Sequence, residues 1–549
     1  MRIAVAAGAR GGGALQPLAD DGTPAGPVTS VPSLVAAVAE RERADRPRWV
    51  WSSSARLYPV LLRAGARVER CHDLELVESL LSGYDGRYGE PRSVAAAWAR
   101  LRGEPVPPDR PPAAESGPQA SLFDDVDEEE TEEIAQIVAV HAEQQKRIAR
   151  VPGFALLAAA ESAGSLIAAE MTHAGLPWSA SAHDELLTEM LGPRPSGGLR
   201  PRRLQDLADK IGAAFGRHVN PDSPAQIVKA LSAAGYQVKT TRAHVLKEID
   251  HPAVPLLLEY KELSRLHTAH GWAWLDTWVK DGRFRPEYVV GGVVSGRWAT
   301  NGGGALQIPR VLRSAVIADE GWSLVVADAA QLEPRVLAAL AGDRAFADAA
   351  AQGDLYAALA DVFTPSAELT ARDKAKLALL SAMYGGGTGE AVQLLGVLKK
   401  RFPDAFEFVE AAAQAGERGH LVRSRLGRTC PPPSADWREL TSTGEDTRSA
   451  SAVRSRGRFT RNFVVQATAA DWALTLMARL RQRLTALGDP HLVFFQHDEV
   501  IVHTPTPLAD EVVAAIEASA EEAGRLLFGR TPVVFPMEAA VVRRYSDAK

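Results

Sequence analysis

Residues 325–335 read VVADAAQLEPR, an apolar run that ends in a carboxylate and is followed by an amphipathic segment. Three apolar residues before Asp328, followed by a helical pattern after Glu333, predict a short buried strand that leads into a helix. Such a strand delivers Asp328 to its exposed end. Taken alone, this Asp is explained equally well as a helix N-cap that satisfies free backbone N–H groups.

A second apolar stretch, residues 491–503, contains the acidic pair Asp498 and Glu499. We interpret it as a second strand that ends in carboxylates. Buried charges need partners or a metal, so two strands that each bring an Asp to one place predict a shared divalent-cation site at Asp328 and Asp498. Mg²⁺ suits such a site, because one or two carboxylates hold it while substrate phosphates fill the other positions.

Residues 372–387, between these two strands, read as a helix closed by glycines. Arg372, Lys376, Leu380 and Tyr384 are spaced four apart and therefore form one stripe on its surface. Cations at one end of the stripe would meet phosphates, and the apolar end would meet base and sugar, so the stripe suits a nucleoside triphosphate. For this helix taken alone, an ordinary solvated basic face with a core tyrosine is the simpler explanation.

Together the three stretches resemble motifs A, B and C of the family A DNA polymerases, the DNA polymerase I group. The family pattern D-Y-S-Q-I-E-L-R resembles residues 328–335. The pattern R-x3-K-x7-Y-G resembles Arg372, Lys376, Tyr384 and Gly385, and H-D-E resembles residues 497–499. Each motif alone is weak, but their order and separations match the family.

The resemblance implies two-metal nucleotidyl transfer of dNTPs to a primer 3′ end, using two Mg²⁺ ions or Mn²⁺ as the alternative. The implied catalytic residues are Asp328, Asp498 and Glu499, and the two Asp side chains are the implied metal ligands. The implied nucleotide-binding residues are Gln331, Glu333, Arg372, Lys376, Leu380 and Tyr384. Glu333 would close the space at the sugar 2′ position, so that ribonucleotides are rejected.

Two further segments resemble DNA-contacting parts of the family. Residues 293–309 resemble T-G-R-L-S-S followed by L-Q-N-I-P, and residues 458–471 resemble R-x3-N-x3-Q-G-T-A-A-D. The implied DNA-binding residues are Arg297, Gln307, Arg458, Asn462, Gln466 and His497. Arg297 would reach the minor groove at the primer end, where an Arg can test pair geometry without naming the base.

Some positions depart from the family pattern. Ala329 and Ala330 replace an aromatic and a hydroxyl residue beside the metal Asp, Leu380 replaces Phe or Tyr, Gln496 replaces an aliphatic residue, and Ala467 replaces Gly. Every metal ligand is retained, so we expect activity with altered sugar selection or fidelity.

The first 120 residues show an α/β pattern, where the resembled family carries a ribonuclease H-like 3′-5′ exonuclease domain. That domain needs acidic metal ligands, but the first strand, residues 2–7, carries none. Residues 52–65 resemble the second exonuclease motif, with Leu57 or Tyr58 at the ligand position, and near residues 138–143 only Glu143 is acidic. We therefore predict a vestigial exonuclease.

The predicted architecture is this α/β domain followed by an α+β right-hand polymerase, without a 5′ nuclease domain. The boundaries are 1–120 for the exonuclease-like domain, 121–154 for an acidic linker and connecting helix, and 155–549 for the polymerase. Within the polymerase we expect the thumb at about 195–280, the palm at about 281–341 and 464–549, and the fingers at about 342–463. The thumb includes residues 220–227 and 256–270, which resemble family segments.

Composition fits this interpretation. A chain of 549 residues predicts two or more domains, and a net charge of −6 excludes a wholly basic nucleic-acid coat. Cys71 and Cys430 give no disulfide framework, and no signal peptide or uninterrupted membrane-spanning apolar run is evident. We expect a cytoplasmic, nucleoid-associated monomer that binds primer-template DNA and dNTPs, has no membrane partner, and acts in repair or accessory replication without proofreading. The alternatives are a non-catalytic DNA-binding protein with a polymerase fold and a polymerase with residual 3′-5′ exonuclease activity.

Overall fold

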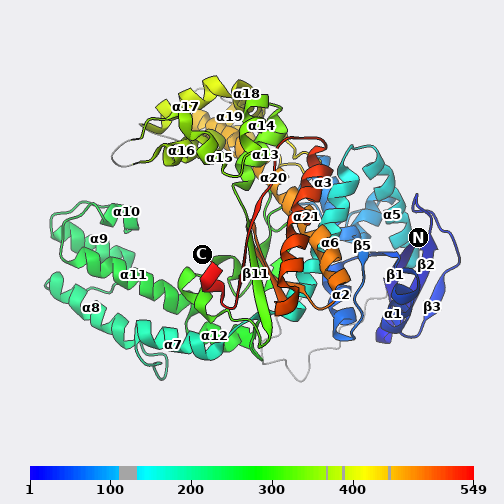
Figure 1. Ribbon diagram of the computed structural model, residues 1–549, viewed down its shortest axis with the longest axis horizontal. Helices are drawn as coiled ribbons and strands as arrows, with labels where there is room; N and C mark the ends of the chain where they lie inside the picture. Colours follow the sequence, from blue (N-terminus) through cyan, green and yellow to red (C-terminus); the bar gives the residue numbers. More distant parts are fainter. Residues whose placement is uncertain (110–132, 366–368, 386–389, 443–446, 549) are drawn as a thin grey trace. The chain divides into compact units, whose positions relative to one another are not determined.

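The structure is a computed structural model that describes residues 1–109, 133–365, 369–385, 390–442 and 447–548 (Figure 1). Its internal contacts divide the chain into two compact units. The larger unit contains Met1–His173, Glu287–Ala299 and Val325–Ala540, and the smaller unit contains Ala174–Pro286, Thr300–Leu324 and Val541–Lys549. Each unit is described by itself.

The N-terminal part of the larger unit is built on a five-stranded sheet in the order β3-β2-β1-β4-β5. Its strands are β1 (Arg2–Ala7), β2 (Gly13–Leu18), β3 (Thr29–Val31), β4 (Arg48–Trp51) and β5 (Arg70–Asp73). Strands β1, β2 and β3 form an antiparallel meander, whereas β4 and β5 run parallel to β1. The strand predicted at residues 2–7 is confirmed.

Helices cover both faces of this sheet. They are α1 (Leu34–Asp45), α2 (Ser54–Arg63), α3 (Leu74–Tyr84), α4 (Val94–Arg102) and α5 (Ile134–Ala149). Successive side chains of a strand point to opposite faces, so Ile3 and Val5 of β1 join the core with α1 and α2, while Ala4 and Ala6 join the core with α3, α4 and α5. Figure 1 shows α1 beside β1 and β3 at the blue end of the chain.

Helix α6 (Phe154–Ala174) links this domain to the rest of the larger unit. It is long and apolar enough to cross a membrane, although the sequence predicted no uninterrupted run of that kind. However, 67% of its apolar window is buried inside the protein, and its Glu161 and Glu170 form ion pairs there. These properties are those of a core helix.

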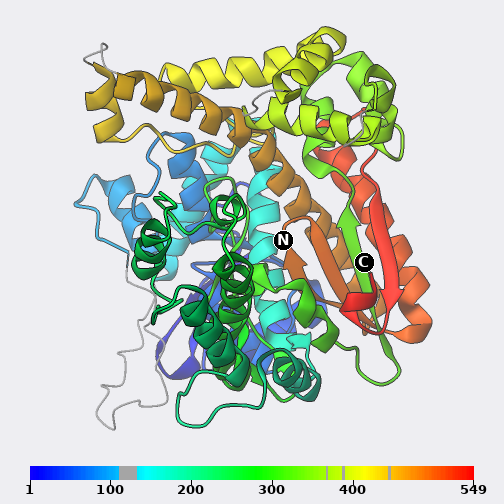
Figure 2. The same cartoon turned by 90° about the vertical axis from the view of Figure 1, so that its left-hand side faces the viewer.

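A second sheet has the order β12-β13-β11-β14 and joins segments that are far apart in the sequence, coloured green, orange and red in Figure 2. Its strands are β11 (Trp322–Ala329), β12 (His491–Gln496), β13 (Glu499–Pro505) and β14 (Met537–Val542). Residues 491–503 were predicted as one strand, which is wrong: β12 and β13 form an antiparallel hairpin. The turn lies at His497 and Asp498, and His497 adopts a left-handed conformation with φ 56°.

The long helix α20 (Thr447–Leu487) passes through the larger unit and packs on α18, α21 and α13. The other elements that follow the N-terminal domain in this unit are β9 (Glu287–Val289), α13 (Leu332–Ala341), α14 (Arg344–Ala350), α15 (Leu355–Ala358), α16 (Ala371–Tyr384), α17 (Glu390–Arg401), α18 (Pro403–Glu417), α19 (Ala435–Ser442) and α21 (Ala509–Phe528). The predicted strand-to-helix transition at residues 325–335 is confirmed as β11 and α13.

The smaller unit is mainly helical. Its elements are β6 (Leu176–Pro177), α7 (Ala180–Leu191), α8 (Arg202–Ala214), α9 (Pro224–Ala233), α10 (Ala243–Leu246), α11 (Ala253–His270), α12 (Trp272–Trp278), β7 (Val279–Lys280) and β8 (Arg283–Phe284). Strand β10 (Ala299–Asn301) lies at its boundary. Trp178, Trp274 and Phe284 form its aromatic core, with ring centroids 4.9 to 5.5 Å apart.

The predicted boundaries of linker, palm, thumb and fingers remain predictions. Of the segment predicted as an acidic linker and connecting helix, 121–154, residues 121–132 lie outside the described residues, and α5 lies in the remainder.

Candidate functional site

Asp328 and Asp498 are brought together where β11 meets the turn of the β12–β13 hairpin. The backbone N–H of Ala329 donates to the carbonyl oxygen of Asp498 over 3.0 Å, which joins the two motifs directly. Burial raises the pKa of Asp498 to about 6; Arg297 opposes this rise, and the Glu333 and Asp328 carboxylates add to it. Two carboxylates of like charge therefore share one partly buried place.

The backbone beside each Asp is unusual. Gln331, three residues after Asp328, and His497, directly before Asp498, both have positive φ, 55° and 56°. Non-glycine residues rarely adopt this conformation, which often occurs at functional sites. Gln331 is the N-cap of α13, and His497 lies in the turn between β12 and β13.

Glu333 connects two other predicted site residues, Arg297 and Tyr384. It is 6% exposed and accepts hydrogen bonds from Arg297 and from the hydroxyl of Tyr384, the latter over 2.5 Å. Burial raises the pKa of Tyr384, and the hydrogen bond to Glu333 raises it further, while a hydrogen bond with Gln466 opposes the rise. Four parts of the chain thus meet around Glu333 and Tyr384: the loop before β10, α13, α16 and α20.

Helix α16 has the predicted form. The side chain of Thr370 caps its N-terminus, and Gly385, with φ 63°, ends it by donating its N–H to the Ser381 carbonyl. Lys376 is exposed and Leu380 is half-buried on this helix. Residues 386–387 of the predicted helix end lie outside the described residues.

Sequence reasoning missed Asp354 and Tyr356 at the start of α15. Asp354 accepts a hydrogen bond from Arg372 over 2.7 Å and another from Gln331 over 2.9 Å, and the Arg372 guanidinium lies over the Tyr356 ring at 5.6 Å. Burial would raise the pKa of Asp354, but these hydrogen bonds hold it at about 2. Only an Asp that precedes a short helix marked this place in the sequence, and that pattern predicts a cap without naming its long-range partner.

Arg335, the last residue of the first motif, has a structural role. It is fully buried, and its guanidinium donates to backbone carbonyls of Ala330, Ala350 and Val534. These bonds tie α13 to the last residue of α14 and to the segment before β14.

The remaining predicted residues lie around this centre. Arg458 is exposed on α20 and lies next to Gly385, where an added Cβ would come within 3.2 Å of its side chain. Asn462 is half-buried on the same helix, His497 is exposed in the hairpin turn, and Glu499 is buried at the start of β13. The side chain of Gln307 lies outside the described residues, and its backbone belongs to the smaller unit.

Among the described residues, no group of three or more His, Cys, Asp or Glu side chains is arranged to enclose a metal ion. The site instead offers two carboxylates, Asp328 and Asp498. Such a pair fits an ion whose other ligands are phosphates and water, which is the usual arrangement for Mg²⁺.

Comparison with known proteins gives the family. The model described as DNA polymerase family A matches residues 200–541, more than half of the chain. The chain belongs to DNA polymerase family A. The resemblance of the three motifs is thereby confirmed, and the family is one that uses divalent metal ions.

Similar proteins support this assignment of the family A chain. It is 29% identical over 332 residues to the thermostable DNA polymerase I of Thermus filiformis, covering 54% of this chain and 37% of that protein. It is 29% identical over 357 residues to DNA polymerase I of Chloroflexus aurantiacus, covering 60% of this chain and 36% of that protein. The matched region therefore spans little more than a third of the length of these relatives.

A solved structure shares the fold of this family A chain. The POL domain of Pol1 from M. smegmatis, in complex with DNA primer-template and dNTP, superposes with a TM-score of 0.73 at 20% identity, covering 99% of this chain and 95% of that one. The predicted polymerase fold is confirmed by this likeness.

Proposed function

We propose that this chain is a template-directed DNA polymerase that adds dNTPs to a primer 3′ end by two-metal nucleotidyl transfer. The observation that carries the proposal is the meeting of Asp328 and Asp498, joined by the hydrogen bond from the Ala329 N–H to the Asp498 carbonyl. Their surroundings hold the other groups that the reaction needs: cationic side chains on α16 and an acidic residue on α13.

The two carboxylates fit a pair of Mg²⁺ ions, with Mn²⁺ as the alternative. Burial raises the pKa of Asp498, repulsion from the Glu333 and Asp328 carboxylates raises it further, and a bound divalent cation would lower it. When bound here, such ions supply a lowered pKa for the primer 3′-hydroxyl and charge stabilisation for the leaving pyrophosphate. The carboxylates of Asp328 and Asp498 would hold them, and Glu499 at the start of β13 would support the second Asp.

The nucleotide-binding role falls to α13 and α16. Arg372 and Lys376 would neutralise the β- and γ-phosphates, Leu380 would face the sugar, and Tyr384 would lie near the templating base. Glu333, held by Arg297 and Tyr384, would close the sugar 2′ side. Arg372 is ion-paired with Asp354, so a triphosphate must replace that carboxylate, while Gln331 stays hydrogen-bonded to Asp354.

Primer-template DNA would lie against α20 and the hairpin turn. Arg458, Asn462 and Gln466 are each separated by four residues on α20, which places them on one face of the helix. Arg297 and His497 would contact the primer terminus, and Gln307 remains a proposed DNA contact. Contacts of this kind hold the duplex without reading its sequence, as a general polymerase must.

We further propose that residues 1–120 form a vestigial, ribonuclease H-like exonuclease domain, so that the enzyme does not proofread. The mixed sheet order β3-β2-β1-β4-β5 supports that fold. Strand β1 has no acidic residue, and Tyr58 is buried with its hydroxyl donating to Glu170 over 2.5 Å. Residues 138–143 lie in α5, where His141 is fully buried.

Primer extension with Mg²⁺ and all four dNTPs tests the polymerase assignment. Asp328→Ala and Asp498→Ala should each abolish extension while leaving primer-template binding nearly unchanged, because the lost groups hold metal rather than DNA. Asp489→Ala, an exposed Asp just before β12, is the matched control and should retain extension. Near wild-type extension by either site variant would refute the active-site assignment, and binding of DNA without extension by the wild type would favour the non-catalytic alternative.

A further inference from the structure

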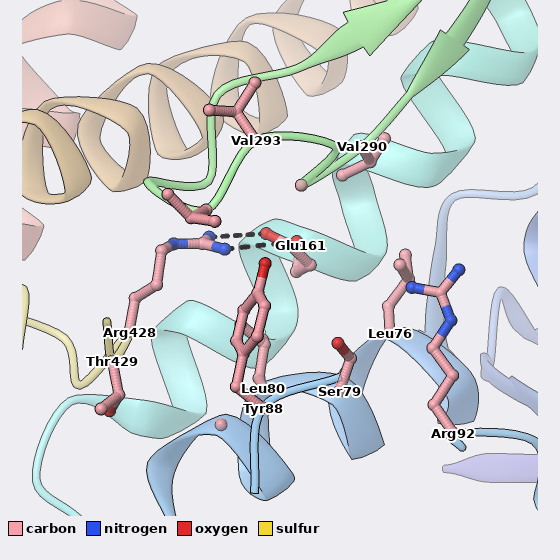
Figure 3. Close-up of a pocket in the computed structure, with 13 residues that line it drawn as sticks. Leu76, Ser79, Leu80, Tyr88, Arg92, Glu161, Val290, Val293, Arg428 and Thr429 are labelled. Atoms are coloured by element: carbon pink, nitrogen blue, oxygen red, sulfur yellow. Dashed lines mark hydrogen bonds and ion pairs between the residues drawn. The ribbon is translucent and has the colours of Figure 1, made fainter. Parts of the chain in front are cut away.

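A buried ion cluster lies against the loop that precedes Arg297. Arg428 is 5% exposed, and its guanidinium donates to Glu161 of α6 over 2.7 Å and to Asp471 of α20 over 2.8 Å. Figure 3 shows Arg428 and Glu161 facing each other, with the loop that carries Val293 close by. We call Arg428, Glu161 and Asp471 the Arg428 cluster.

The loop formed by residues 291–296 rests on this cluster. A Cβ added at Gly291 would come within 2.6 Å of the Glu161 carboxylate, and one added at Gly296 would come within 2.4 Å of the Arg428 guanidinium. Both glycines also have positive φ, 62° and 86°. The sequence therefore lacks side chains at the two points where the loop backbone touches the charged groups.

The same loop leads directly into Arg297. The N–H of Gly296 donates to the Val293 carbonyl over 2.8 Å, and the N–H of Val293 donates to the Arg297 carbonyl over 3.0 Å, which closes a tight turn. The Arg297 side chain then reaches Glu333, which in turn binds Tyr384. On the far side of Arg297, the buried Trp298 packs edge-on against Phe495 at 5.2 Å.

We propose that Arg428 is a positioning residue: through the loop of residues 291–296 it sets the place of Arg297, and so of Glu333, in the polymerase site. This inference rests on the proposed function. It adds α6 and the loop that carries Arg428 to the parts of the chain on which nucleotide addition depends. Glu161 and Asp471 hold the guanidinium from two helices, and the two glycines let the loop follow its surface closely.

The chemistry of arginine suits this task. Its planar guanidinium binds two carboxylates in fixed directions and still offers a flat surface, whereas the lysine ammonium is a point charge on a flexible stem. Lys at position 428 would keep the charge but lose the flat support under Gly296. A shift of about 1 Å in a positioned group can reduce a rate by about 10²-fold.

A double-mutant cycle tests the route through Arg297. Arg428→Lys alone should lower kcat for single-nucleotide addition by about ten- to a hundredfold, with the Kd for primer-template changed less than about twofold. In an Arg297→Ala background, adding Arg428→Lys should change kcat by less than about twofold, because the group that it positions is already absent. Losses that multiply in the double variant would overturn the proposal. Arg423→Lys is the control, since Arg423 is exposed on the same loop and contacts Tyr84; it should keep wild-type kcat.

Gly296→Ala is the second variant, and it keeps all three charged residues. Its methyl group should displace the loop. A crystal structure of the wild type should show the Arg297–Glu333 contact, and a crystal structure of the variant should lack it, while the Arg428 cluster stays intact in both proteins. An Arg297 that stays in place would overturn the inference. This structural result does not depend on activity, so a wild type that fails to extend primers would refute the proposed function separately.

Discussion

Replacement of Arg481 by methionine should strongly destabilise the larger unit. Arg481 is a side chain of α20 that is 4% exposed, and it binds both carboxylate oxygens of Glu170 over 2.6 and 2.9 Å. It also donates to the backbone carbonyls of Val68 and Glu69 in the N-terminal domain. Removing one partner of a buried ion pair costs about 3 to 5 kcal/mol. Because Arg67 still pairs with Glu170 over 2.9 Å, we expect a loss near the lower end of that range.

The pH dependence of this effect follows from Glu170. Burial would raise its pKa, but Arg481 and Arg67 outweigh burial and hold the pKa at about 2, below its ordinary value of 4.5. The folded state thus favours the ionised form, so the stabilisation is complete above pH 4.5 and is lost as pH falls towards 2. A difference of this size corresponds to on the order of 3 kcal/mol at 1.36 kcal/mol per pKa unit.

Urea unfolding at pH 7 and at pH 3, followed by tryptophan fluorescence and circular dichroism, measures both effects. At pH 7 Arg481→Met should clearly lower the urea concentration at the unfolding midpoint. At pH 3 the difference in midpoint between the variant and wild type should be smaller. Arg483→Met is the matched control on the same helix, because Arg483 pairs with Glu522 near the surface, with 33% of its side chain exposed, and should cost at most about 1 kcal/mol. Equal midpoints for Arg481→Met and Arg483→Met at pH 7 would refute the reasoning.

Three further outcomes are expected. Wild-type enzyme should discriminate against dideoxynucleotides, measured as the ratio of kcat/KM for dNTP to kcat/KM for ddNTP. Leu380→Tyr should lower this ratio by about ten- to a hundredfold, because the tyrosine hydroxyl replaces a hydrogen bond worth roughly 1 to 3 kcal/mol. An unchanged ratio would mean that Leu380 does not face the sugar. The protein should not shorten a mismatched primer 3′ end, because β1 carries no acidic ligand; Mg²⁺-dependent release of mononucleotides, lost on deleting residues 1–120, would contradict this. Asp354→Ala should lower the KM for dNTP by up to about fivefold, because an exposed ion pair worth up to about 1 kcal/mol no longer competes with phosphate for Arg372. A raised KM would show instead that Asp354 holds Arg372 ready for phosphate. Asp361→Ala is the control, since it breaks the ion pair with Arg401 and leaves Arg372 untouched.

Patterns among neighbouring residues were sufficient to predict the local elements that carry the chemistry. The apolar run before Asp328 becomes β11, and the helix expected from residue 372 is present as α16, with a Thr cap before it and a glycine after it. These features depend on the periodicity and capping of neighbouring residues, which are visible in the chain. The family resemblance of the motifs then indicated that the two Asp residues belong together.

The hairpin of β12 and β13 was misread because its cues are weak. Its strands are buried on both faces, so they show no alternation of polar and apolar residues that would separate one strand from two. The turn relies on His497 in a left-handed conformation, without the glycine or asparagine that normally marks such a turn.

The pairing of distant charges could not be predicted from local patterns and is seen first in the folded chain. Arg428 is 267 residues from Glu161, and Arg481 is 311 residues from Glu170, yet each pair forms a buried ion pair. Nothing in the local sequence distinguishes these residues from the many solvated charges of the chain. Their roles follow from the packing of α6 against α20 and the loops beside it, because burial makes an unpaired charge costly and so ties each of these charges to a specific partner.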